Sequence, residues 1–406
     1  MLSNLKARAQ ILWEEKPQNL LLALFLIAYP LVVVPLPCRL YGPWPDYFYL
    51  PRLVLLGLLA LLGALCLAWE GVQPRRPYIM LLLAFYLTLA LSASLADHPL
   101  TAWLGAPLRY TGVLTYLLCG VLFLLALKTP AGAWERLLPL WTIGASLAFL
   151  LAVLQAGGIN LVPHEPFRRG MVAFGTLGNP SYLGGYLALS LMPALGTCCR
   201  HRKAWAYISL ALVFLGLLVS LDWGAWMGAG AGIFVYLALA RKEPSPSLDK
   251  KCSLPLAGAS ILFLLFFRLR RLNKLIGMVA FREYWQFLTE GFELFTGVGP
   301  LGWAVGLGPD HLVHLKKMMP WAPFLDKTPN MYLETALTAG LLGLISYLAF
   351  IASVLVCSKR SWVEKKELVS LAGAYLIWGL FSSENIILLP LFWISLGLLA
   401  QEEEGK

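Results

Sequence analysis

The sequence predicts an all-α integral membrane protein, and three observations lead to this fold class. First, 59% of the 406 residues are hydrophobic and only 13% are charged, against about a quarter charged in soluble domains. Second, the apolar residues form long runs, and about 20 such residues make one helix that crosses the hydrocarbon layer. Third, Lys and Arg residues gather between alternate runs. We therefore expect one polytopic domain over residues 1–406 and no soluble domain.

Each apolar run is expected to be a helix, because a helix satisfies its own backbone polar groups where lipid offers no partner. The apolar content is enough for about twelve crossings. In chain order the predicted spans are 20–36, 48–69, 78–95, 110–127, 137–156, 181–199, 205–221, 223–240, 254–267, 331–357, 368–381 and 386–400. The first run has no small-residue cleavage signal and is longer than a signal-peptide core, so we expect it to be retained.

The distribution of positive charge predicts the topology, because short cytoplasmic loops hold an excess of Lys and Arg. Of the 32 Lys and Arg residues, 19 lie on the side of the amino terminus, and 8 of the other 13 lie in one long segment, which is weak evidence for orientation. We expect a multi-pass protein of a bacterial inner (plasma) membrane with both termini in the cytoplasm. Contacts with membrane lipids then explain the net charge of +10, and we expect no nucleic acid partner.

Residues 268–330 form a large extracytoplasmic loop between the ninth and tenth predicted spans. Long connections of this kind usually carry function. Basic residues gather on the same outer side, and guanidinium groups bind pyrophosphate oxygens in a bidentate manner. Phospholipid head groups would satisfy these arginines equally well. Among the seven cysteines and five histidines no spacing matches a zinc site, so we expect no metal.

Five ionisable residues fall near the outer ends of the spans, not at their centres: Arg52, Arg109, Asp222, Glu334 and Glu384. Secondary transporters bind substrate and coupling ions near the midplane. This placement disfavours a transporter and favours a cavity at the outer surface. Lipid-facing snorkelling of each side chain is the alternative.

Four motifs stand in the order and spacing of a known family. They are Gly175-Thr-Leu-Gly-Asn-Pro-Ser-Tyr-Leu-Gly-Gly-Tyr-Leu, the run from Gly105 through Arg109 to Gly112, Arg282 and Trp285 followed by Gly297-Val-Gly-Pro-Leu-Gly, and Asn330, Tyr332, Leu333 and Glu334 followed by Gly340-Leu-Leu-Gly. Together they resemble the O-antigen ligase and O-antigen polymerase superfamily, over nearly the whole chain. Independently of the resemblance, Gly178, Asn179 and Pro180 predict a turn, an N-cap and a first helical residue.

The resemblance implies transfer of a glycan from an undecaprenyl pyrophosphate carrier to the hydroxyl group of a lipid or glycan acceptor at the outer face, without metal or other cofactor. Arg282 is the catalytic candidate for stabilising the leaving pyrophosphate, and a loop salt bridge with Glu283 or Glu293 is its alternative. The candidates for binding substrate are Arg109, Arg52, Asn330, Tyr332 and Trp285. Loop tryptophans are equally typical of an interfacial aromatic belt.

Two positions depart from the family pattern. Pro329 stands where members carry the histidine that acts as base, and Trp223 replaces an arginine that contacts pyrophosphate. His311, His314 or Glu334 could replace the base, with Asp326 and Asp222 as further candidates. His311 and His314 lie three residues apart, so both would lie on one helix face if that segment is helical, and a solvated loop face is the alternative. A transferase that works without a strong base, about 100- to 10,000-fold more slowly, is a second possibility. A glycan-lipid-binding pseudoenzyme on the same scaffold is the alternative to a transferase, and a transporter is a third hypothesis.

The predicted topology can be tested with reporter fusions. Green fluorescent protein fused after Lys203 or Lys242 should fluoresce, because it folds in the cytoplasm, and alkaline phosphatase fused after Asp310 should be active outside. Each site also receives the other reporter as its control. Phosphatase activity after Lys203 together with fluorescence after Asp310 would reverse the orientation.

Overall fold

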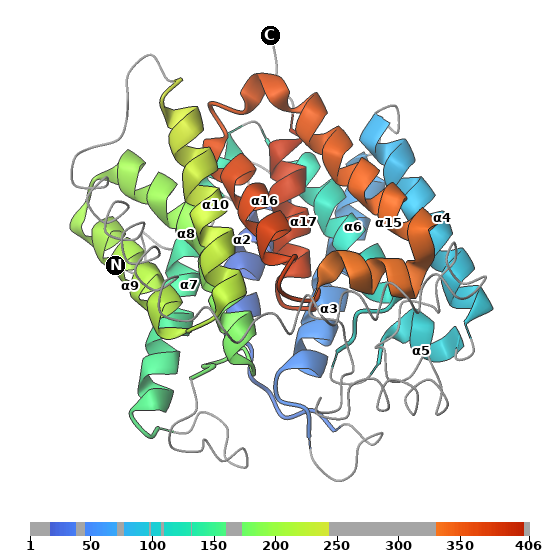
Figure 1. The fold of residues 1–406 in the computed structure, drawn as a ribbon, viewed down its shortest axis with the longest axis horizontal. Helices are drawn as coiled ribbons and strands as arrows, with labels where there is room; N and C mark the ends of the chain where they lie inside the picture. The colour runs from blue at the N-terminus through green and yellow to red at the C-terminus, as the bar shows by residue number, and fades with distance from the viewer. Residues whose placement is uncertain are drawn as a thin grey trace.

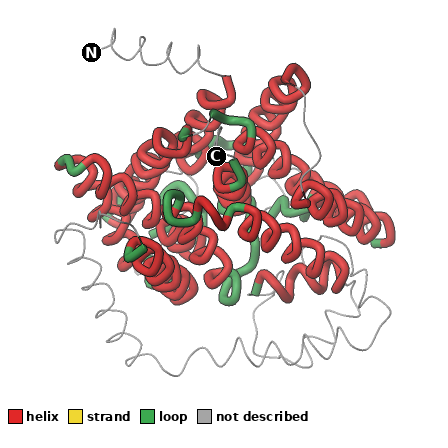
Figure 2. The backbone as a smooth tube through the Cα atoms, turned by 90° about the horizontal axis from the view of Figure 1, so that it is seen from above, coloured by secondary structure: helices red, strands yellow, loops and turns green. Residues whose placement is uncertain are grey.

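A computed structural model describes residues 17–37, 45–70, 77–96, 99–106, 109–130, 132–159, 173–242 and 330–401. Regular structure within these ranges is helical, and the one strand-like contact among them is an isolated antiparallel bridge between Leu36 and Asp46. Figure 2 shows this part of the chain as helices joined by short loops. The prediction of an all-α fold is confirmed for the described residues.

Apart from the short helix α5 and the 3-10 turn η4, the described helices lie in predicted apolar runs (Figure 1). In chain order they are α2 (Pro17–Ala28), the 3-10 turn η1 (Tyr29–Leu31), α3 (Tyr49–Glu70), α4 (Pro77–Leu95), α5 (Pro99–Leu104), α6 (Val113–Leu127), α7 (Ala133–Ala156), α8 (Pro180–His201), α9 (Ala204–Val219), α10 (Trp223–Ala240), α15 (Met331–Cys357), the 3-10 turn η4 (Lys359–Ser361), α16 (Lys366–Trp378) and α17 (Leu389–Leu399). The predicted span 254–267 and the predicted loop 268–330 lie outside the described residues.

Six of the described helices are long and apolar enough to cross a membrane: α3, α4, α7, α8, α10 and α15. Four shorter apolar helices accompany them, at Pro17–Leu31, Val113–Leu127, Ala204–Val219 and Leu389–Leu399. Large side chains on the outside agree with a lipid environment, since Leu65 of α3 is 61% exposed and Leu87 of α4 is 72% exposed. The chain is therefore a helical membrane protein, and twelve crossings remain a prediction.

Two helices form the centre of the bundle. The membrane-length core of α8 is completely buried among α7, α9, α10 and α16. Every residue of α17 is buried as well, against α6 and α16. Figure 1 shows α16 and α17 in the middle, with α10 on one side and α15 on the other. The polar groups of the interior therefore have to pair within the protein.

Helices α10 and α16 approach closely along a row of glycines. A Cβ atom added to Gly228 would lie 2.6 Å from the carbonyl oxygen of Ala374, and one added to Gly232 would lie 3.0 Å from that of Ser370. Small residues at such spacing let helix backbones pack tightly in membranes. These glycines therefore set the separation of α10 and α16.

Helix α15 is broken at Gly340, whose φ of 69° and ψ of −177° are not helical. This region of backbone conformation is essentially restricted to glycine. The hydroxyl group of Ser92 in α4 donates to the carbonyl oxygen of Thr338 at 2.6 Å, beside the break. Figure 1 shows the short first part of α15 turned against its long second part. The break gives the start of α15 a direction of its own.

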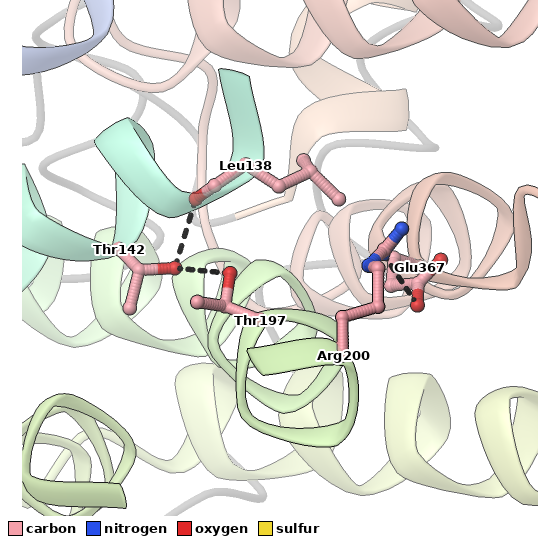
Figure 3. A network of polar contacts seen from close by, with 5 residues as sticks. All are labelled: Leu138, Thr142, Thr197, Arg200 and Glu367. Atoms are coloured by element: carbon pink, nitrogen blue, oxygen red, sulfur yellow. Dashed lines mark hydrogen bonds and ion pairs between the residues drawn. The ribbon is translucent and has the colours of Figure 1, made fainter. Parts of the chain in front are cut away.

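An ion pair between an exposed arginine and a buried glutamate joins the helices at the opposite end from the starts of α8 and α15. Arg200, in the last turn of α8, lies 2.8 Å from Glu367, in the first turn of α16, and stacks over the ring of Trp134 in α7. Nearby, the hydroxyl oxygens of Thr142 in α7 and Thr197 in α8 form a hydrogen bond of 3.4 Å (Figure 3). These contacts tie α7, α8 and α16 together away from the candidate site.

The glycine row generates a stability prediction. We expect Gly228→Ala to lower the free energy of unfolding by about 1–3 kcal/mol, because the added methyl group must push α16 away. Gly230→Ala is the matched control, because a Cβ atom there meets nothing within 4 Å, and it should be neutral or stabilising by up to about 1 kcal/mol. Thermal unfolding in detergent measures both variants. Equal stability of the two would contradict the close approach of α10 and α16.

Candidate functional site

Several helices begin at one end of the bundle, which we call the site end. Arg109, just before α6, donates from Nη1 to the hydroxyl oxygen of Tyr182 in the first turn of α8 at 2.8 Å. The Tyr182 ring packs edge-on against Tyr49 at the start of α3, with ring centroids 6.1 Å apart. The start of α10 joins them, because a Cβ atom on Gly184 would lie 3.0 Å from that of Asp222.

Side-chain oxygens cap four of the helix starts at this end. Asn179 caps α8 and Asp222 caps α10, and the predicted turn and helix start at Gly178, Asn179 and Pro180 are confirmed. Asp46 accepts three backbone N–H groups at the start of α3, each at 2.9 Å. Asn330 accepts those of Tyr332 and Leu333 at the start of α15. Helix starts carry partial positive charge, which the carboxylates of Asp46 and Asp222 offset at α3 and α10 and which the neutral caps Asn179 and Asn330 leave in place at α8 and α15.

A closed loop holds Arg109 in place. A Cβ atom on Gly112 would lie 2.2 Å from the backbone nitrogen of Gly105, so the two glycines bring the ends of the loop into contact. Gly105 has a φ of 88°, and Tyr110 has a φ of 50°, which is uncommon for a residue with a side chain. Such conformations persist where the surrounding structure fixes them and often mark functional sites. The half-buried Arg109 guanidinium is therefore pre-positioned.

Tyr49 belongs to the same group of residues at the site end. Its hydroxyl is within electrostatic range of Arg109, Arg52, Asp46 and Tyr182. Arg109, Tyr49 and Tyr182 therefore form one polar group, which we call the Arg109 cluster. Among the described residues of the site end, this cluster combines a cation with partial exposure.

Arg52 is completely buried and serves the scaffold. Its guanidinium donates to the carbonyl oxygen of Phe48, to that of Pro30 at 3.1 Å and to that of Thr176 at 2.7 Å. Phe48 directly precedes α3, Pro30 lies in η1, and Thr176 lies in the loop that leads to α8. The sequence places Arg52 among the substrate-binding candidates, whereas its geometry gives it a structural role, because all three bonds go to backbone that needs them.

The start of α15 is docked on the end of α16. The Asn330 amide donates to the carbonyl oxygen of Leu380 at 3.1 Å, and the Tyr332 hydroxyl donates to that of Leu376 at 2.7 Å. Both predicted substrate-binding residues thus orient α15 at the site end. Glu334 follows one turn later, is 6% exposed and lies within electrostatic range of the Tyr116 hydroxyl in α6. Arg109 thus precedes α6, and Glu334 lies within electrostatic range of Tyr116 in the same helix.

Glu384 lies deeper in the bundle than the sequence indicates. It is 2% exposed and accepts hydrogen bonds from Tyr116 of α6, from Tyr347 of α15 at 2.6 Å and from Tyr375 of α16 at 3.1 Å. Tyr347 belongs to the second part of α15, so this carboxyl group is inside the helix bundle. The three tyrosines lie in separate apolar runs of the sequence, so the sequence alone does not show that they bind the same carboxyl group.

The remaining candidates from the sequence are placed as follows. Arg282, Trp285, His311, His314 and Pro329 lie outside the described residues. Trp223 is the first residue of α10 and is partly buried. Within the described ranges, no group of three or more His, Cys, Asp or Glu side chains is arranged to hold a metal ion.

No family model matches the sequence, and no curated protein is significantly similar to it. The fold and the site end define a helical membrane protein that presents an arginine and tyrosine cluster at one end of the bundle.

The two arginines should respond differently to substitution. Arg52→Gln should lower the free energy of unfolding by about 2–4 kcal/mol, because it leaves buried carbonyl groups without their charged donor. Arg109→Gln should change stability by less than about 1 kcal/mol, because that side chain is half-exposed. Thermal unfolding in detergent compares the two. A stable Arg52→Gln protein would contradict the structural role of Arg52.

Proposed function

We propose that the protein transfers an undecaprenyl-pyrophosphate-linked glycan to an acceptor hydroxyl at the outer face of a bacterial inner membrane. The observation that carries this proposal is the arrangement around the start of α6. A pre-positioned arginine, Arg109, precedes the helix, and a buried carboxyl group, Glu334, lies within electrostatic range of its second turn. A cation for the leaving group and a base for the acceptor are the two requirements of this chemistry.

Arg109 is assigned to the leaving pyrophosphate. Its guanidinium keeps its charge and offers a planar set of donors that matches phosphate oxygens. The Gly105–Gly112 contact and the bond to Tyr182 hold it before substrate arrives, so little reorganisation is needed when charge develops. Helix starts at the same end add partial positive charge. Arg282 and Trp285 are proposed to complete this site from the large loop.

Glu334 is assigned to the acceptor. In the proposed step the acceptor oxygen bonds to the anomeric carbon while the bond from that carbon to the pyrophosphate oxygen breaks. The electron pair of the broken bond leaves with the pyrophosphate, and the hydroxyl proton passes to the Glu334 carboxylate. Asn330 and Tyr332 support this base by fixing the start of α15. His311 and His314 remain the alternative bases in the loop.

A glycan-lipid-binding pseudoenzyme is the second candidate function. Pro329 and Trp223 favour it, because each replaces a polar group that the resembling family uses. Such a protein would keep the cationic Arg109 cluster for pyrophosphate and would have no need for a base. The acceptor, the carrier glycan and the surrounding lipids are the proposed partners, and no cofactor is proposed.

The proposal predicts separable effects of two substitutions. In protein reconstituted with an undecaprenyl pyrophosphate glycan and acceptor, Glu334→Gln should slow transfer by about 100-fold or more, because base assistance is lost, and should leave carrier binding unchanged. Arg109→Ala should weaken carrier binding and slow transfer. Labelled product and carrier affinity are measured side by side.

Arg241→Gln is the control, because Arg241 is exposed beyond the end of α10, away from the site end. Binding without turnover in the unaltered protein would favour the pseudoenzyme. Unchanged glycan transfer by Glu334→Gln would contradict the role of Glu334 as base and favour His311 or His314. Solute flux across proteoliposomes that Arg109→Ala leaves unchanged would favour a transporter.

A further inference from the structure

We propose that the turn between α8 and α9 binds an anionic phospholipid, with the headgroup on Arg202 and Lys203 and an acyl chain along the outer face of α9. This turn follows the end of α8, so it lies at the end of the bundle opposite the site end. The inference goes beyond the proposed function and does not depend on glycan transfer.

The turn carries two cations whose charge the described residues do not compensate. Arg200, just before them, is paired with Glu367 at 2.8 Å and stacks over Trp134, so its charge is compensated within the protein. Arg202 and Lys203 are both exposed, and neither forms an ion pair with an acidic side chain in the part of the chain that the structure describes. Exposed cations at the end of a membrane helix attract anionic lipid headgroups.

The end of α8 fixes the position of the Arg202 guanidinium. Arg202 has a φ of 50°, and its backbone N–H donates to the carbonyl oxygen of Cys198 at 3.0 Å, which closes the helix. Its side-chain Nε donates to the carbonyl oxygen of Cys199 at 3.4 Å. The two terminal nitrogens make no hydrogen bond with the described residues. They are therefore available to bind two oxygens of one phosphate group.

Helix α9 offers an apolar surface that begins at the turn. It lies at the edge of the bundle, against α7, α8 and α10 (Figure 1). On its outer side Ile208 is 59% exposed and Val219 is 55% exposed, and Trp205 and Leu215 are exposed as well. These four residues are spaced by three, seven and four positions, which places them on one face of the helix. A continuous apolar stripe therefore runs along α9 from the cations of the turn.

The stripe matches the length of an acyl chain in one leaflet. From Trp205 to Leu215 the helix rises by about 15 Å at 1.5 Å per residue, which is about half of the hydrocarbon layer. Tryptophan side chains prefer the boundary between headgroups and chains. The His201 ring packs against Trp205 at this boundary, with ring centroids 5.4 Å apart. A headgroup on Arg202 and Lys203 therefore places its acyl chain on the stripe.

The charge of the turn determines which headgroup it binds. A zwitterionic headgroup brings a cation of its own close to Arg202 and Lys203, and like charges repel. A headgroup that has a phosphodiester and no cation interacts favourably with both side chains. The lipid is therefore one of net negative charge, of the phosphatidylglycerol class.

Native mass spectrometry of the full chain in a non-ionic detergent tests this site by lipid titration. The unaltered protein should bind phosphatidylglycerol more tightly than phosphatidylcholine with the same acyl chains. The double variant Arg202→Gln and Lys203→Gln should bind phosphatidylglycerol about 10- to 30-fold more weakly, because each cation contributes about five-fold. The matched control is Arg241→Gln with Lys242→Gln, which removes two exposed cations after α10 at the same end of the bundle and should keep the affinity.

Equal affinity of the unaltered protein for the two lipids would overturn the proposal, even if a variant failed to fold. Equal weakening in the two double variants would also overturn it, because the effect would then belong to surface charge in general. Glycerol 3-phosphate, a soluble phosphate without acyl chains, should not displace the lipid at equal concentration. Displacement by this compound would contradict the role of the apolar stripe on α9.

Discussion

The fold depends on one constraint, which is that backbone polar groups inside a membrane bundle must find their partners within the protein. Buried cations among the described residues meet part of this constraint by binding backbone carbonyl groups. Arg52 does so for three segments at the site end. Lys365 does so at the opposite end, where its ammonium group donates to the carbonyl oxygens of Leu398 and Gln401 at 3.0 and 2.9 Å and closes the end of α17. Burial and charge therefore coexist because each cation has a fixed set of acceptors.

The same constraint separates scaffold from candidate site. Arg52 and Arg109 carry the same guanidinium group. Arg52 donates its hydrogen bonds to backbone carbonyl oxygens, whereas Arg109 is half-exposed and donates to the hydroxyl oxygen of Tyr182. A guanidinium that already satisfies buried carbonyl groups has few donors for a phosphate. Arg109 is partly exposed and is held by the contact between Gly105 and Gly112. The contrast assigns Arg52 to the scaffold and leaves Arg109 as the candidate for contact with an anion.

The sequence alone predicted much of this arrangement and could not predict the rest. Apolar runs and cap residues such as Asn179 are local signals, so the helix positions and starts follow from them. The role of Arg52 depends on Pro30 and Thr176, and the depth of Glu384 depends on tyrosines in three helices, so both needed the packing. The break in α15 at Gly340 could not be predicted from the sequence for another reason, because a glycine in an apolar run is also compatible with a continuous helix.

The break in α15 gives the helix start at the site end a direction of its own. A continuous helix would place Tyr347 and Glu334 on one rigid rod, so contacts with Glu384 at one level would fix the other. With Gly340 between them, the long part of α15 is anchored by Tyr347 and by α4, while the short part is held by Asn330 and Tyr332 on the end of α16 and by Ser92 of α4 at Thr338. The direction of the helix start that carries Glu334 is therefore set by contacts with two neighbouring helices and is independent of the direction of the long part.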